Sequence, residues 1–316
     1  MIERRRGALY GPDTGAAAAA PGAGEASQQL RGMVLVMLAG CFWSLGGILI
    51  RNIEAAGEWQ ILCLRSLAVS ATLFLVLVAR HRGQVFRRFR QAGLAGVVGG
   101  LCLAAGFTGF IFALTSTTVA NAVFILSASP FAAALLARLL LGEAVRRATW
   151  VAMAGALIGI AVMVGGGIRA GALFGNLMAL VAMLGFSGFA VALRAGRSDD
   201  MLPTACLAGL FAAPLGALMA GDLAVSAPDL AISVAMGVVQ VGAGMVVFTL
   251  GSRHVPAAEL ALLSLTEVVL APIWVWLGFG EVPSLTTLLG GAIMLAAIVG
   301  RALRGMQRKP PPFGAV

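Results

Sequence analysis

The sequence has little charge. Only 11% of its 316 residues are Asp, Glu, Lys or Arg, while 60% are hydrophobic. A soluble domain carries about 25% charged residues, and a soluble fold of this length has too little interior to hide so much apolar surface. The composition therefore predicts an integral membrane protein. It argues against cytosolic enzymes, secreted disulfide-stabilised domains and nucleic-acid-binding proteins.

Cysteine and histidine are also scarce, and neither is arranged for chemistry. Four cysteines lie inside apolar runs without metal-ligand spacing, so we interpret them as small buried hydrophobic residues. Metalloprotease, nucleophile-elbow, Walker and dinucleotide-binding motifs are missing. The sequence therefore predicts no enzymatic activity, cofactor or metal. The cysteines are Cys41, Cys63, Cys102 and Cys206.

Long hydrophobic runs dominate the rest. Ten segments have the length of about 20 residues that spans a bilayer, and prolines open several of them, where a missing N–H is harmless. The fold class expected is all-α, with ten transmembrane helices. The segments lie near 32–51, 60–79, 92–114, 118–141, 148–166, 172–193, 202–220, 229–250, 256–279 and 284–303.

Both ends of the chain differ from these runs. Residues 1–30 contain an Ala/Gly/Pro-rich stretch, Gly15–Gly24, and are expected to form a disordered cytoplasmic tail. No signal peptide is expected, because Arg4–Arg6 are followed by polar and turn residues. Residues 304–316 are basic and then proline-rich, and are expected to form a second cytoplasmic tail.

The basic residues are distributed very unevenly. With the N-terminus placed in the cytoplasm, 18 of the 22 Lys and Arg residues fall on the cytoplasmic side. Arg51 and Arg169 fall opposite, and Arg65 and Arg138 lie within helices. The positive-inside rule then puts both termini in the cytoplasm. It also explains the net charge of +9 without a nucleic-acid partner. Arginine greatly outnumbers lysine, which suggests a bacterial host and its cytoplasmic (inner) membrane.

The two halves of the chain align weakly. An offset of 138 places Gly142-Glu143 on Gly280-Glu281, and an offset of 143 places Arg51 on Arg194. Each half, 32–166 and 172–303, holds five helices. Because five is odd, the halves must have opposite orientations in the membrane. Inverted repeats of this kind are common in secondary transporters, with the substrate site at their interface.

Several motifs resemble the EamA branch of the drug/metabolite transporter superfamily. They are the aromatic–small run Cys41–Arg51, Arg65 in the second helix, and an Ala-Asn…Pro…Gly-Glu pattern from Thr118 to Glu143. A second copy runs from Ala258 to Glu281. One departure is Val268, where the family usually has proline; Pro272 follows a turn later.

The resemblance covers residues 32–303 and implies two EamA repeats around a central cavity. The first four helices of each half would line it, and the fifth and tenth would be peripheral. Family members move amino acids, other metabolites or drugs, often as exporters. The resemblance thus implies a secondary active transporter that exports such compounds by alternating access. The alternative is a membrane-embedded scaffold or enzyme without transport activity.

Glu267 is the sharpest candidate site residue. It lies about 16 Å into the ninth expected helix at 1.5 Å per residue, near the midplane. Polar groups in hydrocarbon are costly and therefore candidates for function. Desolvation disfavours the charged form, so this carboxylate suits proton coupling or recognition of a cationic group. The alternative is a structural pairing with a neighbouring helix.

Arg65 is the matching cation. It lies some 9 Å from the non-cytoplasmic end of the second helix and keeps its proton. Its planar fork would suit a substrate carboxylate. The alternative is a structural ion pair with Glu267 or Glu58.

Other candidates are polar or aromatic residues at mid-membrane depth. Asn121 and Gln240 are candidates for lining the cavity, with interhelical hydrogen bonding as the alternative. Trp43 and Phe186 occupy matching positions in the two halves and are candidate walls for an apolar or aromatic substrate, with core packing or lipid contact as the alternative. The expected partners are a small-molecule substrate and the lipid bilayer. Small-residue spacings such as Gly96–Gly100 also permit a homodimer.

Overall fold

A computed structural model describes residues 23–169, 172–197 and 200–306, and over these residues it contains helices and no strand. Three short elements, the 3-10 turns η1 (Arg82–Gln84) and η3 (Ser252–His254) and the π-helix η2 (Met236–Ala243), join longer helices. The longer helices are α1 (Ala23–Arg51), α2 (Glu58–His81), α3 (Val85–Ser116), α4 (Val119–Leu126), α5 (Ser129–Leu141), α6 (Arg147–Arg169), α7 (Leu173–Ala195), α8 (Leu202–Ala220), α9 (Ala227–Ala235), α10 (Gly244–Gly251), α11 (Ala257–Leu263), α12 (Leu265–Phe279) and α13 (Leu285–Met306).

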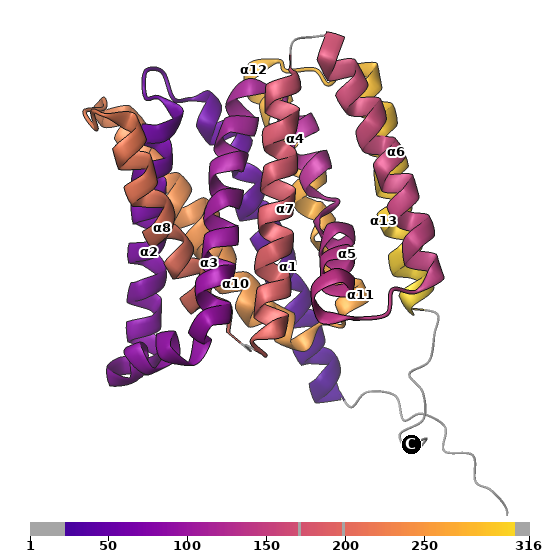
Figure 1. Cartoon of the computed structure of the whole chain (residues 1–316), viewed down its shortest axis with the longest axis horizontal. Coiled ribbons are helices and arrows are strands. Elements are labelled where there is room, and N and C mark those ends of the chain that lie inside the picture. The colour runs from indigo at the N-terminus through magenta and orange to yellow at the C-terminus, as the bar shows by residue number, and fades with distance from the viewer. Residues whose placement is uncertain (1–22, 170–171, 198–199, 307–316) are drawn as a thin grey trace, which may run out of the picture.

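These helices include nine stretches, within the described part of the chain, that are long and apolar enough to cross a membrane. Eight have 19 to 28 residues, and the ninth, Glu58–Ser116, has 59 and contains both α2 and α3. Figure 1 shows α2 and α3 as separate rods that meet at one end of the bundle. The chain is therefore an integral, multi-pass membrane protein.

The start of the chain differs in detail from the expectation. Helix α1 begins at Ala23, inside the stretch 1–30 that we expect to be a tail. Most of both expected tails, 1–22 and 307–316, lies outside the described residues. The start of α1 and the end of α13 lie at the same end of the bundle (Figure 1).

Three of the expected spans are interrupted. Segment 118–141 consists of α4 and α5, 229–250 of α9, η2 and α10, and 256–279 of α11 and α12. Pro130 accordingly sits in the first turn of α5, after the break, where proline needs no hydrogen-bond donor.

Two of these breaks occur at matching places. Ser127 and Ala128 separate α4 from α5, and Ser264 separates α11 from α12. The offset of 138 that relates Glu143 to Glu281 places Ser127 opposite Leu265, one residue from the second break. Broken helices at corresponding positions of two halves commonly mark a transporter's binding region.

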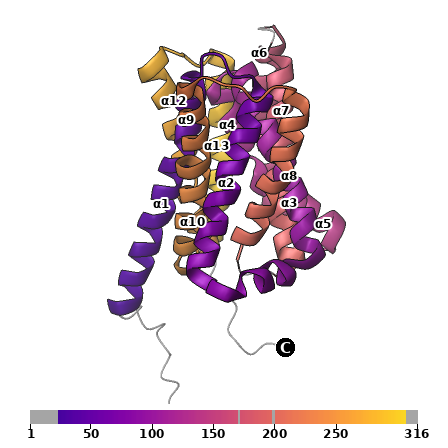
Figure 2. The same cartoon turned by 90° about the vertical axis from the view of Figure 1, so that its left-hand side faces the viewer.

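The helices of the first half pack mainly against helices of the second. The closest pairs are α3 with α7, α2 with α8, and α6 with α13, and α1 packs against both α10 and α12. The pair α6–α13 stands at the edge of the bundle, away from α2 and α8 (Figure 1). In the view of Figure 2, α1 forms the opposite flank of the bundle from α5. The centre is therefore shared by helices of both halves.

Glycine allows the closest of these contacts, between α3 and α7. A Cβ on Gly185 would lie 2.5 Å from the backbone N of Gly106 and 2.6 Å from the carbonyl oxygen of Cys102. Backbone cannot move away as a flexible side chain can, so α3 and α7 require glycine at this crossing. Small residues at such crossings let helices approach closely in lipid.

We expect Gly185→Ala to lower the free energy of unfolding in detergent by about 1–3 kcal/mol, because the added methyl group overpacks the α3–α7 contact. The matched control is Gly165→Ala, also in a helix, where an added Cβ meets nothing within 4 Å. That change should be neutral or should raise stability by up to about 1 kcal/mol. Equal effects of both changes on the thermal midpoint would contradict this account.

Candidate functional site

A buried arginine lies at the centre of the helix bundle. Arg65 on α2 is 1% exposed, and its Nη2 donates a long hydrogen bond of 3.5 Å to Oε1 of Gln240. The guanidinium carbon lies 4.9 Å from the ring centre of Phe107 and 5.8 Å from that of Phe110, both on α3. Aromatic faces attract a desolvated cation by about 2 kcal/mol each.

No acid in the described part of the chain neutralises this arginine. Neither Glu267 nor Glu58 forms an ion pair with Arg65. Its Nε and Nη1 atoms are buried and have no hydrogen-bond partner among these residues. The structural ion pair considered as the alternative role is therefore not formed. A buried cation with free donors is costly, and it is a ready site for an anionic group.

Gln240 connects this arginine to the first helix. It lies in the π-helix η2, is 3% exposed, and its Nε2 donates to the backbone carbonyl oxygen of Trp43 at 3.3 Å. Single π turns inside α-helices occur frequently at functional sites. Two glycines allow this segment to lie close to α1 and α2. A Cβ on Gly244 would collide with the Trp43 indole, and one on Gly237 would collide with the Arg65 carbonyl.

Two aromatic candidates flank the same cluster. The Trp43 ring lies 5.2 Å from that of Phe248, and the Phe186 ring lies edge-on to Phe107 with 6.4 Å between centres. Phe107 in turn stacks on Arg65. The structure thus brings together Trp43, Arg65, Phe186 and Gln240, from both halves of the chain.

Glu267 lies in the first turn of α12, immediately after the break that follows α11. Its side chain is half-buried and has no hydrogen-bond or ion-pair partner in the described residues. Its backbone nitrogen is close to α1, because a Cβ on Gly40 would lie 3.4 Å away. Gly40 is one helical turn from Trp43, so the backbone of Glu267 lies beside α1, about one turn from Trp43.

Asn121 lies outside the cluster around Arg65 and takes part in a separate hydrogen-bond network. Its Nδ2 donates to Oδ1 of Asn176 at 3.2 Å and to Oγ1 of Thr117 at 3.4 Å, and its Oδ1 accepts from Oγ1 of Thr287 at 2.6 Å. The side chain is 5% exposed, so both ends of the amide already bond protein groups. The geometry favours the interhelical role that we weigh against cavity lining.

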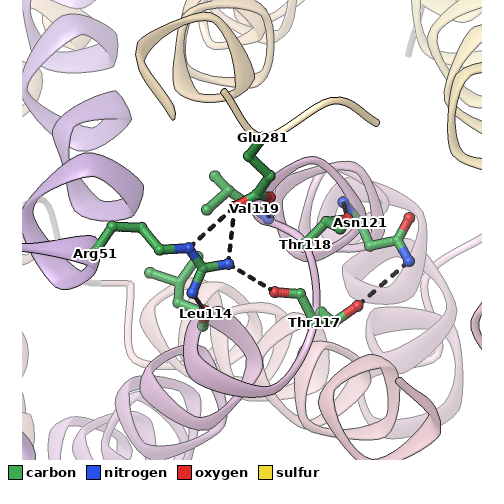
Figure 3. Close-up of polar contacts among 7 residues, drawn as sticks. All are labelled: Arg51, Leu114, Thr117, Thr118, Val119, Asn121 and Glu281. Carbon is green, nitrogen blue, oxygen red and sulfur yellow. Dashed lines mark hydrogen bonds and ion pairs between the residues drawn. The ribbon is translucent and has the colours of Figure 1, made fainter. Parts of the chain in front are cut away.

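Next to Asn121, an ion pair joins the two halves at one end of the bundle (Figure 3). Arg51 Nε donates to Oε2 of Glu281 at 3.0 Å, Nη1 to the Leu114 carbonyl at 2.6 Å, and Nη2 to the Thr117 carbonyl at 3.1 Å. Glu281 Oε1 accepts from the backbone N–H of Val119 at 2.7 Å. The pair therefore also satisfies backbone groups between α3 and α4.

The matching residues of the other half form a second ion pair. Arg194 Nη1 lies 2.8 Å from Oε2 of Glu143. The side chains of this pair are 58% and 42% exposed, against 24% and 17% for Arg51 and Glu281. In each pair, the arginine ends the first helix of one half and the glutamate follows the broken fourth helix of the other half. The sequence offsets contain both correspondences, but sequence reasoning did not combine them into pairs.

Sequence reasoning also missed Asp229. It is fully buried at the start of α9, and its carboxylate accepts hydrogen bonds from the backbone N–H groups of Glu54, Ala55 and Ala56 at 3.0–3.1 Å. Ser226 caps the same helix by accepting from the Asp229 N–H. The spacing Ser-x-x-Asp is a known helix-start signal, and it was available in the sequence.

The EamA-like transporter family matches the chain over residues 30–165 and again over 173–301. The chain belongs to this family. Two EamA regions cover most of its length, as the motifs predict. The membership makes the chain a membrane transporter and argues against an enzyme.

Individual relatives agree with the assignment to EamA. The protein named "Pseudopaline exporter CntI", from two strains of Pseudomonas aeruginosa, is 28% identical over 282 residues, covering 85% of this chain and 94% of the relative. A solved crystal structure has a TM-score of 0.62 at 21% identity, over 90% of this chain and all of the other. The latter likeness supports the fold alone.

We expect Glu281→Gln to lower the free energy of unfolding by about 2 kcal/mol, because it breaks charge-assisted hydrogen bonds in a partly buried place. The same change at the matching position, Glu143→Gln, should lower it by less than about 1 kcal/mol, because that pair is solvent-exposed. Unfolding in detergent measures both. A larger loss for Glu143→Gln would contradict the difference in burial.

Proposed function

We propose that this chain is a secondary active transporter that exports small organic metabolites, amino acids or related compounds, across a bacterial cytoplasmic membrane. Both termini lie in the cytoplasm in this proposal, following the arginine distribution. The EamA membership and the pseudopaline exporter relative support the class and the direction. A scaffold or a membrane-embedded enzyme is the competing function.

The observation that carries the proposal is the unneutralised guanidinium of Arg65. A scaffold gains nothing from a buried cation with two unbonded nitrogens, since an apolar residue there would be more stable. A substrate carboxylate would complete both hydrogen bonds in the fork geometry that arginine prefers. Gln240 holds one arm of the fork, and the rings of Phe107 and Phe110 keep water away.

Glu267 supplies a second function in this proposal. Its carboxylate has no partner in the described residues and follows a helix break, so it can bind and release a proton, or recognise a cationic group, without first breaking an ion pair. Export against a gradient requires a coupling group, and an intramembrane carboxylate without a partner in the described residues suits that role.

We further propose ten spans in two inverted halves, 32–166 and 172–303, that work by alternating access. The matching helix breaks and the two cross-half ion pairs support this arrangement. Arg51–Glu281 would close the non-cytoplasmic end and Arg194–Glu143 the cytoplasmic end. The first pair is better buried and has more hydrogen bonds, which favours a state closed at the non-cytoplasmic end.

Counterflow in proteoliposomes tests the transport proposal. Vesicles preloaded with a panel of amino acids and related carboxylates should accumulate the matching external tracer. We expect Arg65→Gln to reduce counterflow at least about tenfold, since it removes a charge-assisted contact with the substrate. Arg138→Gln is the matched control, because Arg138 lies exposed over Trp150 and should retain activity.

Glu267→Gln separates binding from coupling in the same vesicles. We expect counterflow to persist and proton-driven accumulation to be lost. Unchanged proton-driven accumulation would contradict a coupling role, and loss of both activities would assign Glu267 to substrate binding instead. Folded, inserted wild-type protein that moves no solute of the panel would favour the scaffold.

The gate assignment predicts a change in accessibility. In a background without the four native cysteines, Trp43→Cys reports on the centre of the bundle. Adding Glu281→Gln should increase labelling by a membrane-impermeant thiol reagent applied from the non-cytoplasmic side, because it weakens the closure of that end. Adding Glu143→Gln should not. Equal labelling in both variants would contradict the gates.

A further inference from the structure

A basic cavity opens at the end of the bundle where α2 meets α3, the lower end in Figures 1 and 2. Its volume is about 520 Å³. Five parts of the chain line it, and four of them carry its arginines: the end of α2, the start of α3, the residues directly after α7, and η3, while the start of α8 adds Pro203. Each of the first four contributes one arginine, and these are Arg80, Arg88, Arg197 and Arg253.

The cavity carries unbalanced positive charge. None of the four arginines has an ion pair or a side-chain hydrogen bond among the described residues. Asp200 is the one acid among the described lining residues, and its Oδ2 lies 3.7 Å from Nε2 of His81. That nitrogen is buried without a hydrogen-bond partner in the same part of the chain. The described lining residues thus hold four arginines against one carboxylate, and bringing like charges together is unfavourable without an anion.

Membrane orientation alone does not explain this arrangement. The positive-inside rule needs arginines near a helix end, and any exposed position satisfies it. Arg87 and Arg90 meet that need on the same helix as Arg88 without lining the cavity. The convergence of arginines from four elements on one hollow is a separate feature of the fold.

The opposite end of the bundle shows what the hollow lacks. There, the Asp229 carboxylate ties the loop after α1 to the start of α9 through three backbone hydrogen bonds, the first from Glu54. The offset of 138 places Asp229 opposite Gln91, and the offset of 143 places Glu54 opposite Arg197. Gln91 and Arg197 both line the cavity. The position that the buried Asp229 carboxylate has in one half is therefore taken in the other half by the amide of Gln91, which lines the cavity.

Backbone strain is confined to the same place. Arg82 and Arg197 are the two non-glycine residues with positive φ in the described ranges, at +47° and +48°. Arg197 lines the cavity and Arg82 follows His81, which lines it too. Such conformations persist where the surroundings hold them, and they cluster at ligand sites.

We propose that this cavity binds a phosphate group, which takes the place that the Asp229 carboxylate has in the other half. Arginine forks match the oxygens of a phosphate in paired hydrogen bonds, and the negative charge of a phosphate offsets part of the excess. The group comes either from an anionic phospholipid headgroup, for which basic pockets at helix ends are suited, or from a soluble phosphate compound. The site is separate from the Arg65 cluster and does not depend on the proposed transport.

Thermal unfolding of the full chain in an uncharged detergent tests the site, because a ligand that binds the folded state raises its Tm. The probes are phosphatidylglycerol, with phosphatidylcholine as its control, and inorganic phosphate, with chloride at equal ionic strength. We expect a rise of about 3 °C or more at saturation. A rise with phosphatidylglycerol alone assigns the site to a headgroup, and a rise with inorganic phosphate as well assigns it to a soluble phosphate compound.

The double variant Arg88→Gln/Arg253→Gln should lose this rise. Arg87→Gln/Arg90→Gln removes the same charge outside the cavity and should keep it. A second test adds the missing acid: Gln91→Asp should raise Tm without any anion and abolish the further rise. No rise in the wild type, equal rises in both double variants, or an undiminished rise in Gln91→Asp would each overturn the proposal.

Discussion

The ion pair between Arg51 and Glu281 is the interaction on which the joining of the two halves at one end of the bundle depends. In hydrocarbon, every charge and every backbone group needs a partner, and this pair satisfies both needs at once. It joins the end of α1 to the end of α12, and it bonds the last carbonyls of α3 and the first N–H of α4. The start of α4 is thereby fixed, and with it the amide network of Asn121. Helices from the two halves are held together at this end by polar bonds, while apolar packing holds them along their length.

Part of the candidate site can be predicted from the sequence by the depth of each residue within its expected transmembrane helix. Arg65, Gln240, Trp43 and Phe186 were selected because polar and aromatic residues are unusual at mid-membrane depth, and the structure brings them together. Asn121 met the same criterion, but its amide is used by Thr287 on a helix expected to be peripheral. Pairings between residues more than 50 positions apart, such as Arg194 with Glu143, depend on how the helices pack, which local pattern does not encode. The breaks inside the expected spans do not stand out in the hydropathy either, because apolar residues continue on both sides of them.

Corresponding positions in the two halves form polar interactions that differ in burial and in the number of hydrogen bonds. One end has a buried ion pair and a buried aspartate, while the other has an exposed ion pair and a basic hollow. In the proposed alternating-access mechanism, such a difference would decide which end is closed at rest. The difference between the two ends comes from a few side chains, while the helix arrangement of the two halves is similar. We therefore expect substitutions at these positions to shift the equilibrium between states closed at one end or the other without altering the fold.

The π-helix of residues 236–243 makes the site sensitive to chain length as well as to side-chain chemistry. A π turn accommodates one residue more than the α-helix around it. Removing one residue between Met236 and Ala243 can close the segment into regular α-helix and leave both flanks in place, but one further inserted residue would turn one flank by about 100° relative to the other. Gly244, which must face the Trp43 indole, and Gly237, which must face α2, could then no longer point to their neighbours together. The spacing between these two glycines is therefore constrained, and insertions in this segment should be far less tolerated than substitutions.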